Sequence, residues 1–338
     1  MESARPEPTA SADSSGPPSM VGVFFEGGRV ALRRDLPRPT AHDGESRIAV
    51  RRAGICATDL ALSRGYMGFR GIPGHEFIGR AIDGPLAGQR VVGEINAGCG
   101  RCARCLAGDP RHCEQRSVLG IVGRPGAFAE ELTLPTCNLL EVPDSVSDDA
   151  ATFVEPLAAA CALVERDPVE TGMPALVVGD GRLGLLCAAV LREAGAEVSL
   201  LGRHPERADL LGGGIRHLGR PLDDSSPQSR FPLVVEASGH PECLQRALAW
   251  VEPRGRLVLK TTTERRIELD PTPIVVDEIT LQGSRCGRFD SALALLERGT
   301  IDPRPLVDSR FKLEQATDAL EHAARRGVLK VLIEIDSP

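Results

Sequence analysis

Four cysteines lie close together in the first half of the chain, at Cys99, Cys102, Cys105 and Cys113. Their spacing, C-x2-C-x2-C-x7-C, allows four thiolates to close tetrahedrally around one zinc ion. A closed site of this kind has no open position for a substrate, so its role would be to hold a loop together. An iron–sulfur cluster is the alternative, but the spacing of the fourth cysteine is wrong for it and no proline follows. His112 is expected to be a surface residue, because four sulfurs already fill the zinc shell.

Three further positions carry the residue types of a catalytic zinc site: Cys56, the pair His75 and Glu76, and Glu155. A cysteine, a histidine and a carboxylate form such a shell, which water or a substrate oxygen completes. Spacing alone leaves the question open, since a single cysteine near a strand end is more often a packed core residue.

A glycine-rich segment, Gly179-Asp180-Gly181-Arg182-Leu183-Gly184, fits the pattern G-x-G-x-x-G. An apolar run precedes it and a helical pattern follows, which is the context that a dinucleotide site requires. The first glycine permits the tight turn, the second lets the backbone approach the pyrophosphate, and the third lets helix and strand pack closely. The helix N-terminus, at Arg182 and Leu183, favours the phosphate charge. A glycine-rich turn without a ligand is the alternative, which this context disfavours.

The end of the next strand predicts which coenzyme is bound. An NAD site usually has Asp or Glu about 20 residues further on, to bind the ribose hydroxyls. Here Gly202 occupies that place and Arg203 follows, with Arg207 close behind. A small residue followed by arginine leaves room for a 2′-phosphate and supplies a guanidinium to hold it. The sequence therefore favours NADP(H) over NAD(H), with Arg203 stacking on adenine or solvated as the alternative.

The hydrophobic pattern changes along the chain and predicts two architectures. Residues 21–142 alternate short apolar runs with Gly, Pro and Asp, which indicates strands of a β-barrel. From about residue 150, strands and helices alternate, as in a doubly wound parallel sheet. Strands are predicted at residues 175–178, 197–201, 233–236, 256–259 and 328–335, and helices at 153–165, 183–194, 242–250, 290–298 and 314–325.

Composition narrows the classes of partner. The 338 residues are 42% hydrophobic and 26% charged, with a net charge of −7 and no basic block, so a nucleic acid or membrane surface is not expected. No apolar stretch reaches the ~20 residues of a membrane span, and no secretory signal is visible, so a cytoplasmic protein is expected. Residues 1–19 have the composition of a disordered tail, and Met20 is a second candidate start.

Taken together, the motifs resemble those of the zinc-containing medium-chain alcohol dehydrogenase family, alongside its sorbitol, threonine and archaeal glucose dehydrogenases. The similarity extends from about Val21 to the end of the chain. The motifs that carry it are GICATD at residues 54–59, GHEFIG at 74–79, the four-cysteine lobe, EPL at 155–157, the glycine fingerprint and VEASG at 235–239.

The resemblance implies a GroES-like β-barrel catalytic domain joined to a Rossmann coenzyme domain, with two zinc ions per chain. The implied division is a tail at residues 1–19, a catalytic domain at 20–156 and 283–338 with its zinc lobe at 95–116, and a coenzyme domain at 157–282. A homodimer or homotetramer is implied, joined through the sheet edge near residues 274–281.

The resemblance also assigns roles to the metal-site residues. Cys56 and His75 would be ligands of the catalytic zinc, Glu76 a neighbour that can exchange into the shell, and Glu155 the third ligand. Glutamate at this last position aligns the chain with the polyol and sugar dehydrogenases more than with the ethanol-type enzymes.

The resemblance also assigns roles to three residues around the metal site, in proton transfer, in orienting the histidine ligand and in binding the coenzyme. Thr58 would pass the substrate proton, Asp59 would orient the histidine ligand, and Lys330 would lie near the coenzyme pyrophosphate, with a solvated lysine as the alternative. Ala61 departs from the family pattern, because many relatives have a histidine there that completes the proton relay.

The expected reaction is hydride transfer between a nicotinamide coenzyme and an alcohol, polyol or sugar-like substrate. Tyr66, Met67, Phe69 and Arg70 lie in a loop near the expected substrate site, although ordinary packing would also account for them. The alternatives are a lyase or double-bond reductase on the same fold and a coenzyme-sensing binding protein. The zinc donors Cys56, His75, Glu76 and Glu155 argue against a zinc-free reductase, and the same donors with Thr58 argue against a binding protein, while a zinc lyase stays an alternative.

Overall fold

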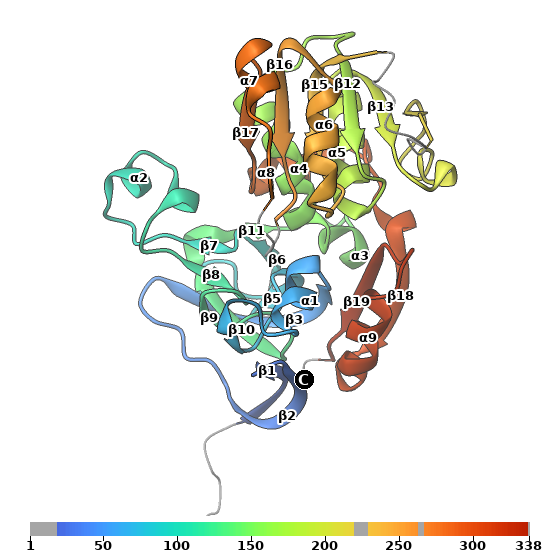
Figure 1. The fold of residues 1–338 in the computed structure, drawn as a ribbon. Helices are drawn as coiled ribbons and strands as arrows, with labels where there is room; N and C mark the ends of the chain where they lie inside the picture. Colours follow the sequence, from blue (N-terminus) through green and yellow to red (C-terminus); the bar gives the residue numbers. More distant parts are fainter. Residues whose placement is uncertain (1–18, 220–228, 263–266, 337–338) are drawn as a thin grey trace, which may run out of the picture.

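The computed structural model describes residues 19–219, 229–262 and 267–336. Figure 1 shows a β-rich body, with the α2 lobe projecting from it, beside a layered α/β body. Residues 1–18 of the predicted tail lie outside the described residues. Ser19 contradicts that prediction, because it begins strand β1 (Ser19–Glu26) and pairs with the following strand.

The β-rich body is built around two sheets. The smaller sheet has the order β2-β1-β4 and the larger one β11-β6-β5-β3-β19-β18, with β10 also pairing with β3. Their remaining strands are β2 (Arg29–Pro37), β3 (Glu45–Gly54), β4 (Arg70–Gly71), β5 (Glu76–Ala81), β6 (Arg90–Gly93), β10 (Glu131–Pro135), β11 (Leu139–Glu141), β18 (Val307–Lys312) and β19 (Lys330–Glu334). Short strands β7 (Asn96–Ala97), β8 (Ser117–Leu119) and β9 (Gly123–Arg124) form a further small sheet at the base of the cysteine lobe. The chain returns at its end to complete the larger sheet, because β19 lies antiparallel against β3.

The α/β body contains a parallel sheet with the order β14-β13-β12-β15-β16-β17. These strands are β12 (Pro174–Val178), β13 (Glu197–Leu201), β14 (Arg216–His217), β15 (Phe231–Glu236), β16 (Val251–Leu259) and β17 (Thr280–Gly283). In chain order this is 3-2-1-4-5-6, the doubly wound arrangement in which dinucleotides bind where the strand order reverses. The predicted α/β class, a GroES-like domain with a Rossmann sheet, is confirmed.

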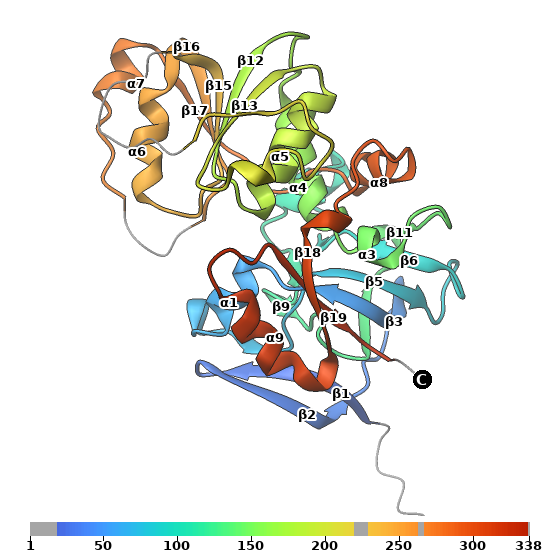
Figure 2. The same cartoon turned by 90° about the vertical axis from the view of Figure 1, so that its right-hand side faces the viewer.

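Both faces of this sheet are covered by helices, as the unbroken apolar run of β12 predicts. Ala175 and Val177 join one core cluster with α4 (Val154–Arg166) and α5 (Arg182–Glu193). Leu176 and Val178 join the other, against α6 (Glu242–Ala249). Figure 2 shows α4 and α5 on one side of the sheet and α6 with α7 (Thr272–Val276) on the other.

The remaining helices belong to the β-rich body or to the connections, namely α1 (Ala57–Leu62), α2 (Ala103–Leu106), α3 (Asp148–Ala151), α8 (Phe289–Glu297) and α9 (Ala316–Ala323). The helix predicted at 314–325 is shorter than expected, because its first residues form a 3-10 turn. The predicted domain boundary at residue 157 falls inside α4.

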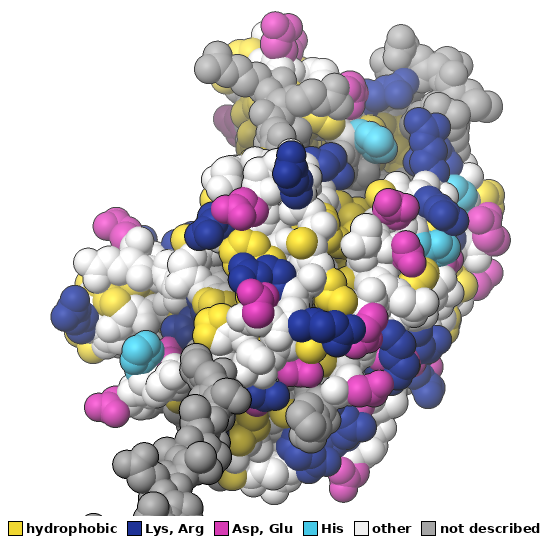
Figure 3. Space-filling view, turned by 90° about the horizontal axis from the view of Figure 1, so that it is seen from below, with side chains coloured by type: hydrophobic (Ala, Val, Ile, Leu, Met, Phe, Trp, Pro, Cys, Tyr) yellow, Lys and Arg dark blue, Asp and Glu magenta, His cyan; other side chains and the backbone are white. Residues whose placement is uncertain are grey.

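The surface carries both signs of charge. Figure 3 shows basic and acidic side chains interspersed on the face of the molecule seen from below. Within the described part of the chain, no helix is both long enough and apolar enough to span a membrane.

The turn between β12 and α5 depends on close packing at Gly184. A β-carbon there would overlap the carbonyl oxygen of Gly179, so Gly184→Ala must push α5 away from the strand. We expect it to lower the free energy of unfolding by about 1–3 kcal/mol, the usual cost of overpacking, measured by urea denaturation. Gly181→Ala is the matched control, because a β-carbon at Gly181 has open space around it. Equal stability of the two variants would contradict this account.

Candidate metal and coenzyme sites

Three predicted metal donors converge where α1 and β5 begin. The donor atoms of Cys56, His75 and Glu76 all lie within 4.8 Å of one another. Cys56 precedes the first residue of α1, and Glu76 is the first residue of β5. His75 and Glu76 are 3% and 1% exposed, and His75 Nδ1 is buried without a hydrogen-bond partner among the described residues. This combination of soft sulfur, imidazole and carboxylate suits zinc.

Asp59 holds the two segments that carry these donors. Its Oδ2 accepts a hydrogen bond from the Cys56 amide (2.8 Å), and its Oδ1 accepts one from the Gly74 amide (3.2 Å). The same Oδ1 lies 3.4 Å from His75 Nδ1, and the side chain is fully buried. Asp59 therefore fixes the loop before β5 against the start of α1, beside the histidine it was predicted to orient.

Glu76 has a partner that the sequence analysis did not assign to it. Lys330 forms a buried ion pair with Glu76 and lies over the Phe153 ring, with Nζ 5.3 Å from its centroid. The idea of a solvated lysine is therefore wrong, since Lys330 is 1% exposed. Gly54 makes room for the pair, because a β-carbon there would overlap the Glu76 carboxylate.

The fourth predicted ligand, Glu155, stands apart from this group. It lies in the first turn of α4 and is not among the donors that converge within 4.8 Å. Burial raises its pKa to about 7, and the neighbouring charges of His75 and Glu76 act on it in opposite directions. Burial alone would also raise the pKa of Glu76, but Lys330 and His75 hold it below its usual value.

Thr58 lies beside the converging donors, with its hydroxyl oxygen 3.8 Å from Cys56 Sγ. The loop that follows α1 is held mainly by its own packing. Phe69 stacks edge-on against Phe25, with ring centroids 6.2 Å apart, and Tyr66 packs against the main core cluster. Arg70 pairs with Glu26 (2.5 Å) on the exposed side of β1. Packing therefore accounts for Tyr66 and Phe69.

The four cysteines of the lobe form the second donor group. Cys99, Cys102, Cys105 and Cys113 bring their sulfurs within 4.8 Å of one another. The sulfurs of Cys102 and Cys113 are 3.7 Å apart. Backbone amides of Arg101 and Cys102 lower the pKa of Cys99 to about 6, which favours its thiolate form. His112 is not part of the group and contacts Asp109 instead, at 2.8 Å.

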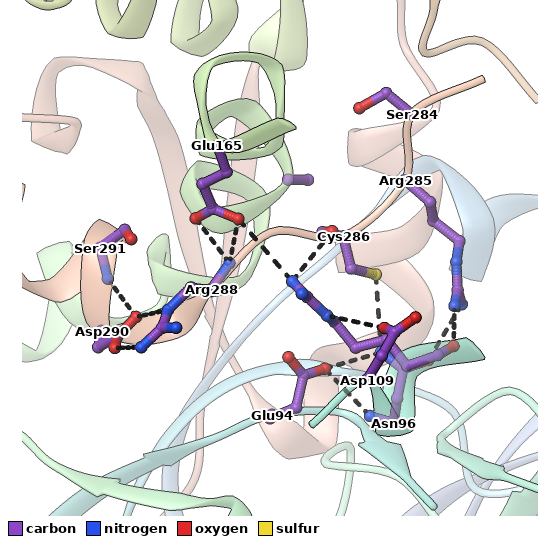
Figure 4. Close-up of polar contacts among 12 residues, drawn as sticks. Glu94, Asn96, Asp109, Glu165, Ser284, Arg285, Cys286, Arg288, Asp290 and Ser291 are labelled. Atoms are coloured by element: carbon purple, nitrogen blue, oxygen red, sulfur yellow. Dashed lines mark hydrogen bonds and ion pairs between the residues drawn. The ribbon is translucent and has the colours of Figure 1, made fainter. Parts of the chain in front are cut away.

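A polar network joins the cysteine lobe to the α/β body. Figure 4 shows Arg285 directed toward Asn96, and Glu165 at the end of α4 directed toward Arg288. Arg285 donates to Asn96 Oδ1 (3.0 Å) and to the carbonyl of Arg111 (2.7 Å). Arg111 Nη1 in turn lies 3.9 Å from Glu165 Oε2. The lobe is thus tied to the connection between β17 and α8, where the chain leaves the parallel sheet.

The glycine-rich turn has the backbone geometry that its pattern predicts. Gly179 has φ +114°, and a β-carbon there would lie 2.6 Å from the Ser238 Cα, so this position favours glycine. Gly181 precedes the first residue of α5 and has open space around it. Arg182, the first residue of the helix, donates to the carbonyl of Ile55 (2.5 Å), next to the Cys56 donor. The turn is therefore connected directly to the metal site.

The carboxyl end of β13 differs from the sequence prediction in one respect. Gly202 and Arg203 follow this strand, and Arg203 is exposed. An acid nevertheless lies there, because Asp180 of the glycine-rich turn accepts hydrogen bonds from the amides of Arg203 (2.5 Å) and His204 (2.6 Å). Arg207 donates to the carbonyl of Asp180 (3.0 Å). An acid in the middle of the fingerprint, together with glycine at the strand end, was the available sequence signal.

Comparisons with known proteins agree with this arrangement. Residues 42–144 match the family model for the alcohol dehydrogenase GroES-like domain, and residues 183–298 match the model for zinc-binding dehydrogenase. An L-threonine 3-dehydrogenase of Streptomyces coelicolor is 31% identical, over 89% of this chain and 94% of its own.

Two solved structures share the fold and contain coenzyme. The rspB alcohol dehydrogenase of Escherichia coli CFT073, in complex with NADH, superposes with a TM-score of 0.83 and 25% identity, over 94% of this chain and 99% of its own. A zinc-binding dehydrogenase of Sinorhizobium meliloti 1021, bound to NADP, superposes with a TM-score of 0.84 and 26% identity. The match covers 94% of this chain and 99% of that one. The chain belongs to the zinc-dependent medium-chain dehydrogenase family. It is an oxidoreductase that acts on a small molecule with zinc and a nicotinamide coenzyme.

Removing one partner of the buried pair should be costly. Lys330→Met leaves the Glu76 carboxylate buried without its cation, so we expect the free energy of unfolding to fall by about 3–5 kcal/mol. The double variant Lys330→Met with Glu76→Leu replaces the pair by apolar side chains and should recover most of that loss. Urea denaturation at one fixed zinc concentration measures both. A single variant as stable as the wild type would refute the ion pair.

Proposed function

We propose that this protein is a zinc-dependent alcohol dehydrogenase that transfers hydride between a nicotinamide dinucleotide and an alcohol, polyol or sugar-like substrate. Residues 20–156 and 283–338 form its catalytic domain and residues 157–282 its coenzyme domain. The observation that carries the proposal is the convergence of Cys56, His75 and Glu76 at a point tied by Arg182 to the glycine-rich turn.

The donor sets fit two zinc ions. One site offers a thiol, an imidazole and a carboxylate within 4.8 Å of one another, and the other offers four thiols, which are donor sets that zinc prefers. Cys56 and His75 would hold the catalytic ion together with Glu155, the third ligand that the family resemblance implies. Glu76, which converges with Cys56 and His75 and pairs with Lys330 through Oε2, would be the carboxylate that can exchange into the shell. The four clustered sulfurs of the lobe would hold a structural ion, because thiolates this close need a cation between them.

When bound, zinc supplies a Lewis acid for an alcohol or carbonyl oxygen, and the nicotinamide supplies the hydride acceptor or donor. The residues of the chain hold the histidine ligand in position and move the substrate proton. Thr58 Oγ1 accepts or returns the substrate proton, since its hydroxyl lies next to Cys56. Asp59 keeps His75 in place. Alanine at position 61 has no proton-accepting side chain, so beyond Thr58 the proton would need a bound coenzyme hydroxyl and water, or another residue of the chain.

The coenzyme contacts would come from the glycine-rich turn and the end of β13. Gly179, Gly181 and Gly184 allow the pyrophosphate to approach the N-terminus of α5, where Arg182 and Leu183 begin the helix. Gly202, Arg203 and Arg207 favour NADP(H), as the sequence indicates. Asp180 supplies an acid at the same place and favours NAD(H).

Metal analysis of purified protein tests the assignment of both sites. We expect two zinc ions per chain in the wild type and one in Cys56→Ser, which should lose at least ~100-fold of its alcohol-dependent coenzyme reduction. Cys113→Ser should lose the other ion and unfold more readily. Cys243→Ser, outside both donor groups, is the control. Two zinc ions in Cys56→Ser, with activity intact across primary alcohols, secondary alcohols, polyols and aldoses, would overturn the proposal.

We also propose a homodimer or homotetramer formed through the edge of the coenzyme sheet. Strand β17 ends the sheet, and α7 beside it exposes Val275 and Val276 at 74% and 72%. Exposed apolar side chains next to a sheet edge are typical of an interface.

The oligomer test uses sedimentation velocity. Val275→Asp with Val276→Asp should halve the sedimenting mass, from a dimer to one chain or from a tetramer to a dimer, because two carboxylates would be buried at the interface. Leu106→Asp, an exposed apolar residue of the lobe at 76%, is the control. An unchanged mass in the double variant would place the interface elsewhere.

A further inference from the structure

The carboxylate of Asp180 lies at the junction of the glycine-rich turn and the end of β13. Its Oδ2 accepts three hydrogen bonds, from the amides of Arg203 (2.5 Å) and His204 (2.6 Å) and from His204 Nδ1 (3.1 Å). Asp180 is 6% exposed. Burial alone would raise its pKa, but the bonds from His204 and Arg203 hold the pKa below its usual value, so the group is ionised at neutral pH.

Gly202 is what admits this carboxylate. A β-carbon on Gly202 would overlap the Cβ, Cγ and Oδ2 atoms of Asp180. The conformation of Asp180 and any side chain at position 202 therefore exclude each other. The Asp180 carboxylate therefore fills the space that a side chain at position 202 would occupy. Asp180 follows β12, which pairs in parallel with β13.

The second carboxylate oxygen of Asp180, Oδ1, has no hydrogen-bond donor among the described residues. Oδ2 is saturated by its three donors, while Oδ1 accepts no hydrogen bond from the described residues. Arg207 Nη1 lies 4.0 Å from Oδ1, beyond hydrogen-bond distance. The two guanidinium nitrogens of Arg207 already donate to the carbonyls of Asp180 (3.0 Å) and Gly327 (2.7 Å). Oδ1 can therefore accept a hydrogen bond from a hydroxyl group of a ligand.

We infer that Asp180 selects the coenzyme by accepting a ribose hydroxyl of NAD(H) and by excluding the 2′-phosphate of NADP(H). This rests on the proposed dehydrogenase function, because the ends of β12 and β13 are where a doubly wound sheet meets the adenosine half of a dinucleotide. A phosphate dianion here would face a fixed carboxylate. The two amides that could hold the phosphate are already bonded to that carboxylate.

The basic residues around Asp180 explain why the sequence alone favoured the other coenzyme. Without the Asp180 carboxylate, the amides of Arg203 and His204 and the His204 imidazole would form a vacant anion site, with the exposed Arg203 beside it. Asp180 occupies this site as an internal anion. Its removal should therefore convert a site for a ribose hydroxyl into a site for a phosphate.

Calorimetric titration with coenzyme fragments tests the inference without a substrate. The probes are ADP-ribose and 2′-phospho-ADP-ribose, each added to the zinc-loaded protein. The wild type should bind ADP-ribose at least about tenfold more tightly. Asp180→Asn, which keeps the shape of the side chain, should lose most of this preference, and Asp180→Ala should reverse it. Asp209→Asn removes an exposed carboxylate nearby and should change the ratio less than about twofold.

A double variant distinguishes a specific role from damage to the turn. Asp180→Gly with Gly202→Asp returns the acid to the end of β13 and should restore the preference for ADP-ribose. Equal ratios in the wild type and Asp180→Asn, or a wild type that prefers the 2′-phosphorylated probe, would overturn the inference. Failure of the wild type to bind either probe would instead overturn the proposed function.

Discussion

The buried carboxylate of Asp59 is the interaction on which the catalytic site depends. A carboxyl group without solvent contact is stable only when hydrogen bonds around it offset its desolvation. Asp59 meets this need with two backbone amides, from Cys56 and Gly74, and with the ring of His75. Each partner belongs to a segment that carries a metal donor. The hydrogen bonds of one buried side chain therefore link the segments that carry the donors.

A second set of contacts places the coenzyme domain relative to this site. Arg182 reaches from the first turn of α5 to the carbonyl of Ile55, and Lys260, at the end of β16, donates to Ser284 Oγ (3.0 Å) and the Arg285 carbonyl (3.2 Å). Arg285 continues the chain of contacts to Asn96 beside the cysteine lobe. Two of these four acceptors are backbone carbonyls, so Arg182 and Lys260 hold the main chain itself in place. Such contacts resist a shift of one domain more than side-chain pairs on an exposed surface would.

The fold and the donor types were accessible from the sequence because they depend on local patterns. The glycine fingerprint, the unbroken apolar run of β12 and the cysteine spacing all lie within short segments. The Glu76–Lys330 pair joins residues 254 positions apart, and the contact of Asp180 with Arg203 spans 23 positions. Neither follows from a local pattern. The sequence shows no acid at the end of β13 itself, because the acid that lies there belongs to the glycine-rich turn.

The position of Asp180 also has a mechanical consequence. Asp180 lies in the glycine-rich turn and accepts hydrogen bonds from two backbone amides that follow β13, so it ties the turn to the end of the neighbouring strand. These contacts hold the turn in one conformation, which under the proposed function would lower the entropy lost when the coenzyme binds. The same contact requires glycine at position 202. The carboxylate of Asp180 therefore sets both the rigidity of the turn and the charge at the end of β13.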